Sequence, residues 1–320
     1  MGESVVITGG CGFLGAALAR RIRDKGVGLP DGRHIFPSIH LWDRAGSEGS
    51  APDGASFTAV DIADPDAVAA AMPQDTALIY HLAAVVSGQA EADYDLAMRV
   101  NLGGTNAVLA AARSLPQPVP VIGTSSLAVY GGTLIEPLTE ATPVQPQNTY
   151  GVTKAMAELV MADYRRRGWA DARTLRLPTV TVRPGRPNAA ASSFASSIIR
   201  EPLAGEPAVC PVDPPMAMWV TSPDAAVQAL WHAPSVPTGD WPVFGALNVP
   251  GLRVTVGEML AALRTRAGDA VADLVAMQPD PLIIGIVGTW PTSFDTSVAE
   301  RLGFSGDAGF EANLDQALRM

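Results

Sequence analysis

A tyrosine and a lysine four residues apart, Tyr150 and Lys154 in the stretch TYGVTK, are residue types that could together remove a proton from a substrate. Positions i and i+4 of a helix lie on one face, so the lysine ammonium would lie beside the phenol. A neighbouring positive charge favours the phenolate and lowers the pKa of a tyrosine from about 10 toward neutrality. The pair therefore predicts a base for a hydroxyl proton, and the alternative is a piece of ordinary helix.

A serine hydroxyl could join this pair. The apolar residues 120–123 run into Thr124, Ser125 and Ser126, which would place Ser126 at the carboxyl end of a strand, where ligands bind in open α/β sheets. Its hydroxyl could hydrogen-bond the oxygen that loses a proton, while a nicotinamide takes a hydride. Serine-rich turns are ordinary, so Ser126 gains weight only from the tyrosine and lysine that follow it.

A glycine-rich turn near the start of the chain predicts where a cofactor would bind. The apolar residues 4–8 are followed by Gly9, Gly12 and Gly15 at GxxGxxG spacing and by an amphipathic stretch at 13–25. A strand, a glycine turn and a helix in this order bring bare backbone and a helix N-terminus against a pyrophosphate. The alternative is a tight turn that binds nothing. The strand and helix around the glycines favour a dinucleotide site.

The end of the next apolar segment predicts the type of dinucleotide. Asp43 lies 28 residues after Gly15, and a carboxylate there hydrogen-bonds ribose hydroxyls and repels a 2′-phosphate. We therefore expect NAD, with NADP as an alternative because Arg44 adjoins Asp43. Asp61 and Ile62 follow a third strand-like segment and could meet the adenine edge, although Asp61 could equally be a capping residue.

The pattern of the first half predicts an α/β fold, a Rossmann-type doubly wound parallel sheet. Continuously apolar, β-branched segments indicate strands buried on both faces and joined by helical crossovers. The strand-like segments are 5–8, 39–42, 57–60, 77–82, 120–124 and 175–182, and those of helical period are 12–25, 64–72, 99–113 and 150–167.

The second half predicts a smaller C-terminal substrate-binding lobe. Prolines cluster at 202–215 and 234–250, and Thr255 to Glu258 forms a capping box that starts a helix. We expect an NAD-binding domain at 1–184 and the lobe at 185–320, with an approximate boundary and a possible return of the chain to the first domain. A cleft between the two would hold the substrate.

Composition excludes several classes of partner. The net charge is −10 with a pI near 4.8, which disfavours nucleic acid and anionic membranes. The longest apolar runs are far shorter than the roughly 20 residues that span a bilayer, and no leader precedes the first strand, so we expect a cytoplasmic protein. The four histidines and two cysteines show no metal-ligand spacing, and no metal site or disulfide is expected.

Together these motifs resemble the extended short-chain dehydrogenase/reductase family, the group of the sugar-nucleotide epimerases and dehydratases. The matching stretches are 7–15, Asp43, HLAA at 81–84, Asn101 in NLGGTN, TSSLAVYGG at 124–132 and YGVTK at 150–154. The resemblance implies that Ser126 is the catalytic serine, Tyr150 the base, and Lys154 its activator and ribose anchor. It also implies a homodimer and further NAD-binding residues, namely Phe13, Leu14, Leu82, Ala83, Ala84, Asn101, Pro178 and Val180.

The second half departs from the sugar-nucleotide members of this family. Ala217 and Met218 stand where those enzymes usually carry an arginine and an aspartate, so a diphosphate would lack its cation. The segment 183–194 instead offers groups for a small polyhydroxylated acid, and it resembles a branch that oxidises the carbon-2 hydroxyl of small sugar acids with NAD. The substrate-binding candidates, with Ser126, are Thr179, Arg183, Asn188, Ser192, Ser193 and Arg200.

Two alternatives of different kinds remain. One is a nucleotide-sugar epimerase or dehydratase in which NAD stays bound and is recycled. The other is a non-catalytic NAD-sensing protein on the same fold, because a fold does not imply a function. A sensor needs only the glycine loop, so the presence of Ser126, Tyr150 and Lys154 favours an enzyme.

Overall fold

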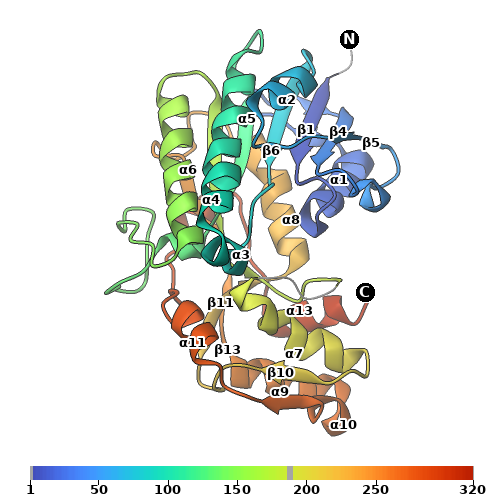
Figure 1. Ribbon diagram of the computed structural model, residues 1–320, viewed down its shortest axis with the longest axis vertical. Helices are drawn as coiled ribbons and strands as arrows, with labels where there is room; N and C mark the ends of the chain where they lie inside the picture. The colour runs from blue at the N-terminus through green and yellow to red at the C-terminus, as the bar shows by residue number, and fades with distance from the viewer. Residues whose placement is uncertain (1–2, 186–189, 320) are drawn as a thin grey trace.

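A seven-stranded parallel sheet forms the centre of the larger unit in a computed structural model that describes residues 3–185 and 190–319 (Figure 1). All of its neighbouring strands pair in parallel. The strands that follow β1 first extend the sheet toward one edge, and the later strands extend it from the other side of β1 toward the opposite edge. This reversal opens a crevice at the carboxyl ends of the strands. The strand order is β12 (Ala246–Asn248), β8 (Asp171–Leu177), β7 (Pro120–Ser126), β6 (Thr76–His81), β1 (Ser4–Thr8), β4 (Ser38–Asp43) and β5 (Ala55–Ala59).

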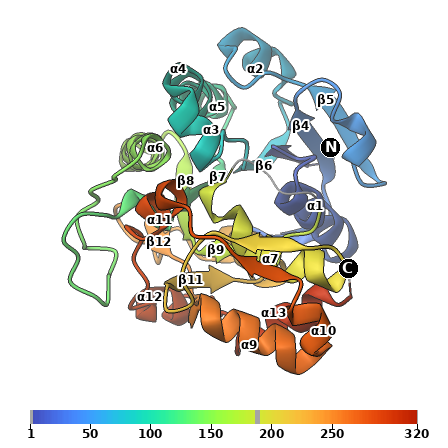
Figure 2. The same cartoon turned by 60° about the horizontal axis from the view of Figure 1, so that its bottom comes forward.

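Helices cover both faces of this sheet, which confirms the predicted doubly wound α/β fold. Alternate side chains of β1 explain the layers: Val5 and Ile7 pack with α1 and α8, while Val6 packs with the helices of the other face. Figure 2 shows α2, α5 and α6 on one side and α1 on the other. The helix bounds are α1 (Phe13–Lys25), α8 (Pro223–His232), α2 (Pro65–Ala71), α5 (Gly104–Arg113) and α6 (Thr149–Arg166).

A separate hydrophobic core builds the smaller lobe seen at the bottom of Figure 1. The predicted capping box is present, with the side chains of Thr255 and Glu258 bonding each other's backbone. The lobe contains α7 (Phe194–Leu203), α9 (Val256–Ala267), α13 (Phe310–Ala317), the sheet β13 (Leu252–Thr255), β11 (Ala217–Thr221) and β9 (Thr179–Val180), and the pair β10 (Ala208–Cys210) and β14 (Val275–Met277).

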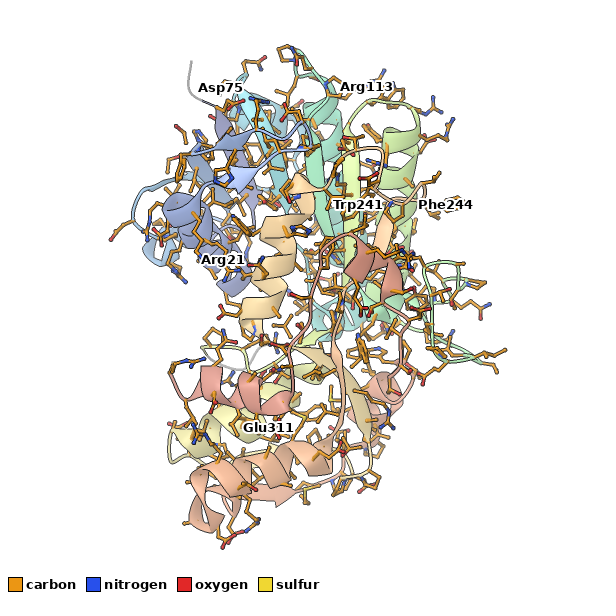
Figure 3. All side chains as sticks on the ribbon, turned by 180° about the vertical axis from the view of Figure 1, so that it is seen from behind. Arg21, Asp75, Arg113, Trp241, Phe244 and Glu311 are labelled. Carbon is orange, nitrogen blue, oxygen red and sulfur yellow. The ribbon has the colours of Figure 1, made fainter. Side chains whose placement is uncertain are left out.

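The chain returns from the lobe to the larger unit more than once. After the first lobe strands, α8 packs on α1, where Arg21 Nη1 donates to Gln228 Oε1 at 2.8 Å (Figure 3). Strand β12 then joins the edge of the large sheet beside β8. Both α8 and β12 therefore belong to the packing of the larger unit, although they follow residue 184.

The segment predicted as one strand at 175–182 is two strands. It breaks at Pro178, which has no N–H to donate to a ladder. Before this proline β8 pairs within the large sheet, and after it β9 pairs with β11 of the lobe. Pro178 thus lies where the chain crosses from one unit to the other.

The remaining elements are short and connect these layers. None of the helices in the described ranges is long and apolar enough to cross a membrane. The bounds are β2 (Val27–Gly28), β3 (His34–Ile35), η1 (Glu48–Ser50), α3 (Ser87–Ala92), α4 (Tyr94–Ala97), η2 (Met98–Gly103), η3 (Leu127–Val129), η4 (Ala191–Ser193), η5 (Ala233–Ser235), α10 (Asp269–Ala272), α11 (Pro281–Val287) and α12 (Ser297–Arg301).

Candidate active site

A cavity of about 490 Å³ runs along the carboxyl ends of the strands and under the lobe. It brings together nearly all of the residues predicted from the sequence, although they span more than 180 positions. Those that line it are Gly9, Gly12, Phe13, Leu14, Gly15, Asp43, Asp61, Ile62, Leu82, Ala83, Ala84, Ser126, Tyr150, Lys154, Pro178, Thr179, Val180, Arg183 and Ser192. Asn101, Ser193 and Arg200 do not line it, and Asn188 lies outside the described residues.

One end of the cavity fits the pyrophosphate of a dinucleotide. Helix α1 begins after Gly12 with no side-chain cap and no acidic residue in its first turn, so its first N–H groups are left for a ligand. The helix approaches the turn closely, because a Cβ on Gly15 would lie 2.4 Å from the Gly9 carbonyl oxygen. Only glycine at this position allows that approach, which agrees with the predicted role of the glycine spacing.

The carboxylate of Asp43 is held at the rim of the same turn. Its two oxygens accept from the backbone N–H groups of Cys11 at 3.0 Å and Arg44 at 2.9 Å. These bonds fix the carboxylate at the carboxyl end of β4, beside the turn that fits the pyrophosphate. A ribose bound in this cavity would meet a fixed acceptor for its hydroxyls, as NAD requires.

Ser126, Tyr150 and Lys154 meet midway along the cavity. The Ser126 hydroxyl lies close enough to the phenol of Tyr150 to lower its pKa, and Lys154 Nζ donates to the carbonyl oxygen of Thr124 at 2.9 Å. The glycine inside the TYGVTK stretch makes this meeting possible, because a Cβ on Gly151 would lie 2.1 Å from a backbone oxygen of η3. Helix α6 can therefore begin directly against the end of β7.

Burial dominates the electrostatics of this cluster. It raises the pKa of Tyr150 to about 12, and the hydrogen bond from Ser126 and the charge of Arg183 act in the opposite direction. Burial also lowers the pKa of Lys154 to about 8. The sequence predicted a phenol pKa shifted toward neutrality by the lysine; the structure differs, because desolvation penalises both charged forms and the ammonium bonds Thr124.

Asn101 and His81 brace the strand ends from behind the cavity wall. Asn101 accepts from the N–H of Val85 at 2.7 Å and donates to its carbonyl oxygen at 3.1 Å. His81 bonds Thr8 at 2.9 Å, and burial lowers its pKa to about 3, so it is neutral. Asn101 thus holds the loop around Val85, which lines the cavity, although Asn101 itself does not line it. Among the described residues no group of side chains could hold a metal ion.

Two arginines of the predicted substrate segment have different surroundings. Arg183 lines the cavity and acts electrostatically on Tyr150, and it forms no salt bridge within residues 3–185 and 190–319. Arg200 pairs with Glu201 at 2.5 Å and donates to the Arg183 carbonyl oxygen at 2.8 Å. Arg200 therefore supports the backbone of Arg183 from outside the cavity. Ser193, in η4, is buried and does not line the cavity.

Sequence reasoning missed three residues with polar groups that line the cavity: Ser87, Gln89 and Trp290. Ser87 accepts the N–H of Ala191 at 3.1 Å, so helix α3 touches the lobe there. Trp290 follows α11, and its buried indole N–H has no acceptor among the described residues. Ser87 could have been predicted from the sequence, because it begins a helix soon after the end of a strand. Trp290 reaches the cavity only because α11 packs on η4.

Comparison with known proteins identifies the family. Residues 5–222 match the NAD dependent epimerase/dehydratase family. The chain belongs to this family. It is an NAD-dependent oxidoreductase of the extended short-chain dehydrogenase type, as the resemblance of its motifs predicted, and its cofactor is NAD. The cofactor end of the cavity described above fits that assignment.

Curated relatives match almost the whole chain. The chain is 47% identical over 309 residues to D-erythronate dehydrogenase of Cupriavidus necator, covering 96% of this chain and 95% of that protein. It is 39% identical to D-erythronate dehydrogenase of Haemophilus influenzae, covering 98% of each. Among solved structures, a nucleoside-diphosphate-sugar epimerase from Agrobacterium tumefaciens is similar with a TM-score of 0.90 and 35% identity, covering 99% of this chain and 94% of that one.

Proposed function

We propose that this enzyme oxidises the carbon-2 hydroxyl of a small sugar acid, D-erythronate, to 2-oxo-tetronate with NAD. Two relatives that match nearly the full chain bear the name D-erythronate dehydrogenase, which supports this substrate. The observation that carries the proposal is Arg183, a cavity-lining guanidinium beside Tyr150 with no carboxylate partner in the described ranges. A substrate carboxylate would supply that partner.

The roles of the side chains follow from their positions. Tyr150, as the phenolate, accepts the proton of the carbon-2 hydroxyl, and Ser126 hydrogen-bonds the same oxygen as it becomes a carbonyl. Bound NAD supplies the acceptor for the hydride that leaves carbon 2. The substrate thus loses one proton to the protein and one hydride to the cofactor.

Arg183 explains why the oxidised carbon would be the one next to the carboxylate. The charge of Arg183 lowers the pKa of Tyr150, and the phenol of Tyr150 acts to raise the pKa of Arg183. The two groups therefore face the same region of the cavity. Burial lowers the pKa of Arg183, which marks a cation kept partly out of water, where a charge-assisted bond to a carboxylate is strong. We infer that the carboxylate binds Arg183, and that Ser192 and Thr179 are placed for the remaining hydroxyls.

A nucleotide-linked sugar is the second candidate, because a structure named as a nucleoside-diphosphate-sugar epimerase is 35% identical. Ala217 and Met218 lie on β11 outside the cavity and bring no cation to it. A diphosphate would therefore lack the cation of that pattern, and the single charge of Arg183 matches one carboxylate better than a diphosphate. This disfavours the recycling reaction, and the clustered Ser126, Tyr150 and Lys154 disfavour a sensor.

The carbon that is oxidised can be identified with deuterium. D-erythronate labelled with deuterium at carbon 2 is expected to transfer the label to NADH and to react more slowly than unlabelled substrate. The same acid labelled at carbon 3 is expected to give unlabelled NADH at the normal rate. Label arriving from carbon 3 would contradict the assignment of the carboxylate to Arg183, because that anchor places carbon 2 at the phenol.

We also propose a homodimer through helix α6. This helix carries Met156 and Leu159, which are 36% and 67% exposed, and the neighbouring α4 exposes Tyr94 to 58%. Large apolar side chains gathered on one helical face often mark an interface. Light scattering of the purified protein is expected to give twice the chain mass, and a monomer mass that persists at high concentration would contradict the dimer.

A further inference from the structure

A buried ion pair lies one helical turn beyond Lys154. Arg176 of β8 donates from Nε to Glu158 Oε1 at 2.9 Å and from Nη2 to Glu158 Oε2 at 2.6 Å. Both side chains are almost fully buried, with 7% and 6% of their surfaces exposed. Removing two charges from water costs free energy that their attraction often only offsets, and apolar replacements are frequently as stable. Stability alone is therefore a weak explanation for the pair.

The pair is anchored on the side away from Lys154. Arg176 Nη1 donates to the hydroxyl of Tyr130 at 2.5 Å, and that hydroxyl is 2.9 Å from Asn248 Oδ1 on β12. These contacts tie the guanidinium to the edge of the large sheet. The carboxylate of Glu158, in contrast, belongs to α6, where positions 154 and 158 share one face.

Lys154 needs a nearby negative charge. It is 7% exposed, and its only hydrogen bond among the described residues goes to the uncharged Thr124 carbonyl. Burial pulls its pKa down, and the charge of Glu158 acts to raise it. The other titratable groups that face it do not help: His81 on β6 is neutral, and Tyr150 rests as the protonated, uncharged phenol.

We propose that Glu158 is a positioning residue that keeps the ammonium of Lys154 charged for the reaction, with Arg176 and Tyr130 holding its carboxylate in place. An ammonium that stays protonated beside Tyr150 stabilises the phenolate that accepts the substrate proton. Glu158 does not line the cavity, so it acts only through Lys154. The proposal rests on the proposed role of Lys154 but not on the identity of the substrate.

The chain has only two lysines, Lys25 and Lys154, so the charge of Lys154 can be followed directly. Protein labelled with ¹³C at lysine Cε would give two NMR signals, assigned with Lys25→Arg. In the wild type the Lys154 signal is expected to titrate with a midpoint near pH 8. In Glu158→Gln that midpoint is expected to fall by roughly one pH unit or more, because the attraction to a buried ammonium is lost. Glu158→Asp, which keeps the charge, is expected to restore most of the shift.

A matched control separates this role from a structural one. Asp171→Asn breaks another ion pair on the same strand, the one between Asp171 and Arg173. The two side chains are 2.6 Å apart, and that of Arg173 is fully buried. This control is expected to lower the melting temperature without moving the Lys154 midpoint. If Glu158→Gln behaves like Asp171→Asn, the pair is structural and the proposal is wrong.

Two further readouts keep the test decisive. If Glu158→Gln does not fold, the double variant Glu158→Gln/Arg176→Met removes both charges, and an unchanged Lys154 midpoint in it also overturns the proposal. If the midpoint falls but no sugar acid is oxidised, the proposed substrate fails while the role of Glu158 stands. With an active substrate, kcat near pH 8 is expected to fall roughly fivefold in Glu158→Gln, because the charged fraction of Lys154 falls from about one half to about one tenth, a loss that the Asp171→Asn control does not share.

Discussion

Replacing Tyr150 with phenylalanine is expected to lower kcat by about three orders of magnitude, because a positioned base contributes about 10²–10⁴-fold. The phenylalanine ring fills nearly the same volume, so the dissociation constant of NAD is expected to change little. The remaining rate is also expected to lose its pH dependence. Burial raises the pKa of Tyr150 to about 12 and the reaction needs the phenolate, so the wild-type rate rises with pH through the neutral range. Steady-state kinetics and NAD titration calorimetry measure both effects.

Tyr164→Phe is the matched control for this change. Tyr164 lies on the same helix and packs its ring edge against Trp169 at a centroid distance of 5.1 Å, away from the cavity. It is expected to leave kcat within about twofold. A Tyr150→Phe protein that keeps full turnover, or one that loses NAD binding together with turnover, would show that the phenol is not the base.

Replacing Arg183 with glutamine is expected to lower kcat/KM for D-erythronate by about a hundredfold or more. Truncating one partner of a buried, hydrogen-bonded charge pair costs about 2–5 kcal/mol, most of it from leaving the other charge unpaired. The loss is expected mainly in KM, because the carboxylate is bound before and during the reaction. Loss of the arginine charge also raises the pKa of Tyr150, and because that pKa already lies far above neutrality, kcat is expected to fall by a similar factor on both sides of neutral pH.

Two comparisons isolate the carboxylate. A polyol of the same length, with a hydroxymethyl group in place of the carboxylate, is expected to be a poor substrate of both proteins. The preference of the wild type for the acid should therefore largely disappear in Arg183→Gln. Arg200→Gln, which loses the pair with Glu201 but leaves Arg183 in the chain, is expected to cost less. If Arg183→Gln keeps its preference for the acid, the carboxylate binds elsewhere.

The cofactor half of the site could be predicted because its signals are local. Gly9, Gly12 and Gly15 act through one strand, turn and helix, and residues 150 and 154 meet through helical spacing alone. The strands of the sheet were readable for the same reason, since burial on both faces requires apolar side chains at every position. The break at Pro178 and the edge strand β12 were missed, because the pairing of each depends on the tertiary fold.

The substrate half could be predicted only in part because it depends on long-range packing. Arg183 was found from its residue type, but its difference from Arg200 depends on Glu201 and on a bond across two elements. Trp290 reaches the cavity from a segment 140 residues beyond Tyr150, with no spacing rule that connects them. The pKa of Tyr150 also could not be read from the lysine beside it, because burial outweighs that charge.

The most direct test of the proposed function is whether NADH accumulates in solution when the purified protein is mixed with NAD and D-erythronate. Many turnovers per protein chain, with NADH recovered after the protein is filtered away, are the predicted result, and other aldonic acids are expected to react more slowly. If no aldonic acid yields NADH while a nucleotide-linked sugar is converted without NADH release, the enzyme recycles its cofactor and the sugar-acid assignment is wrong.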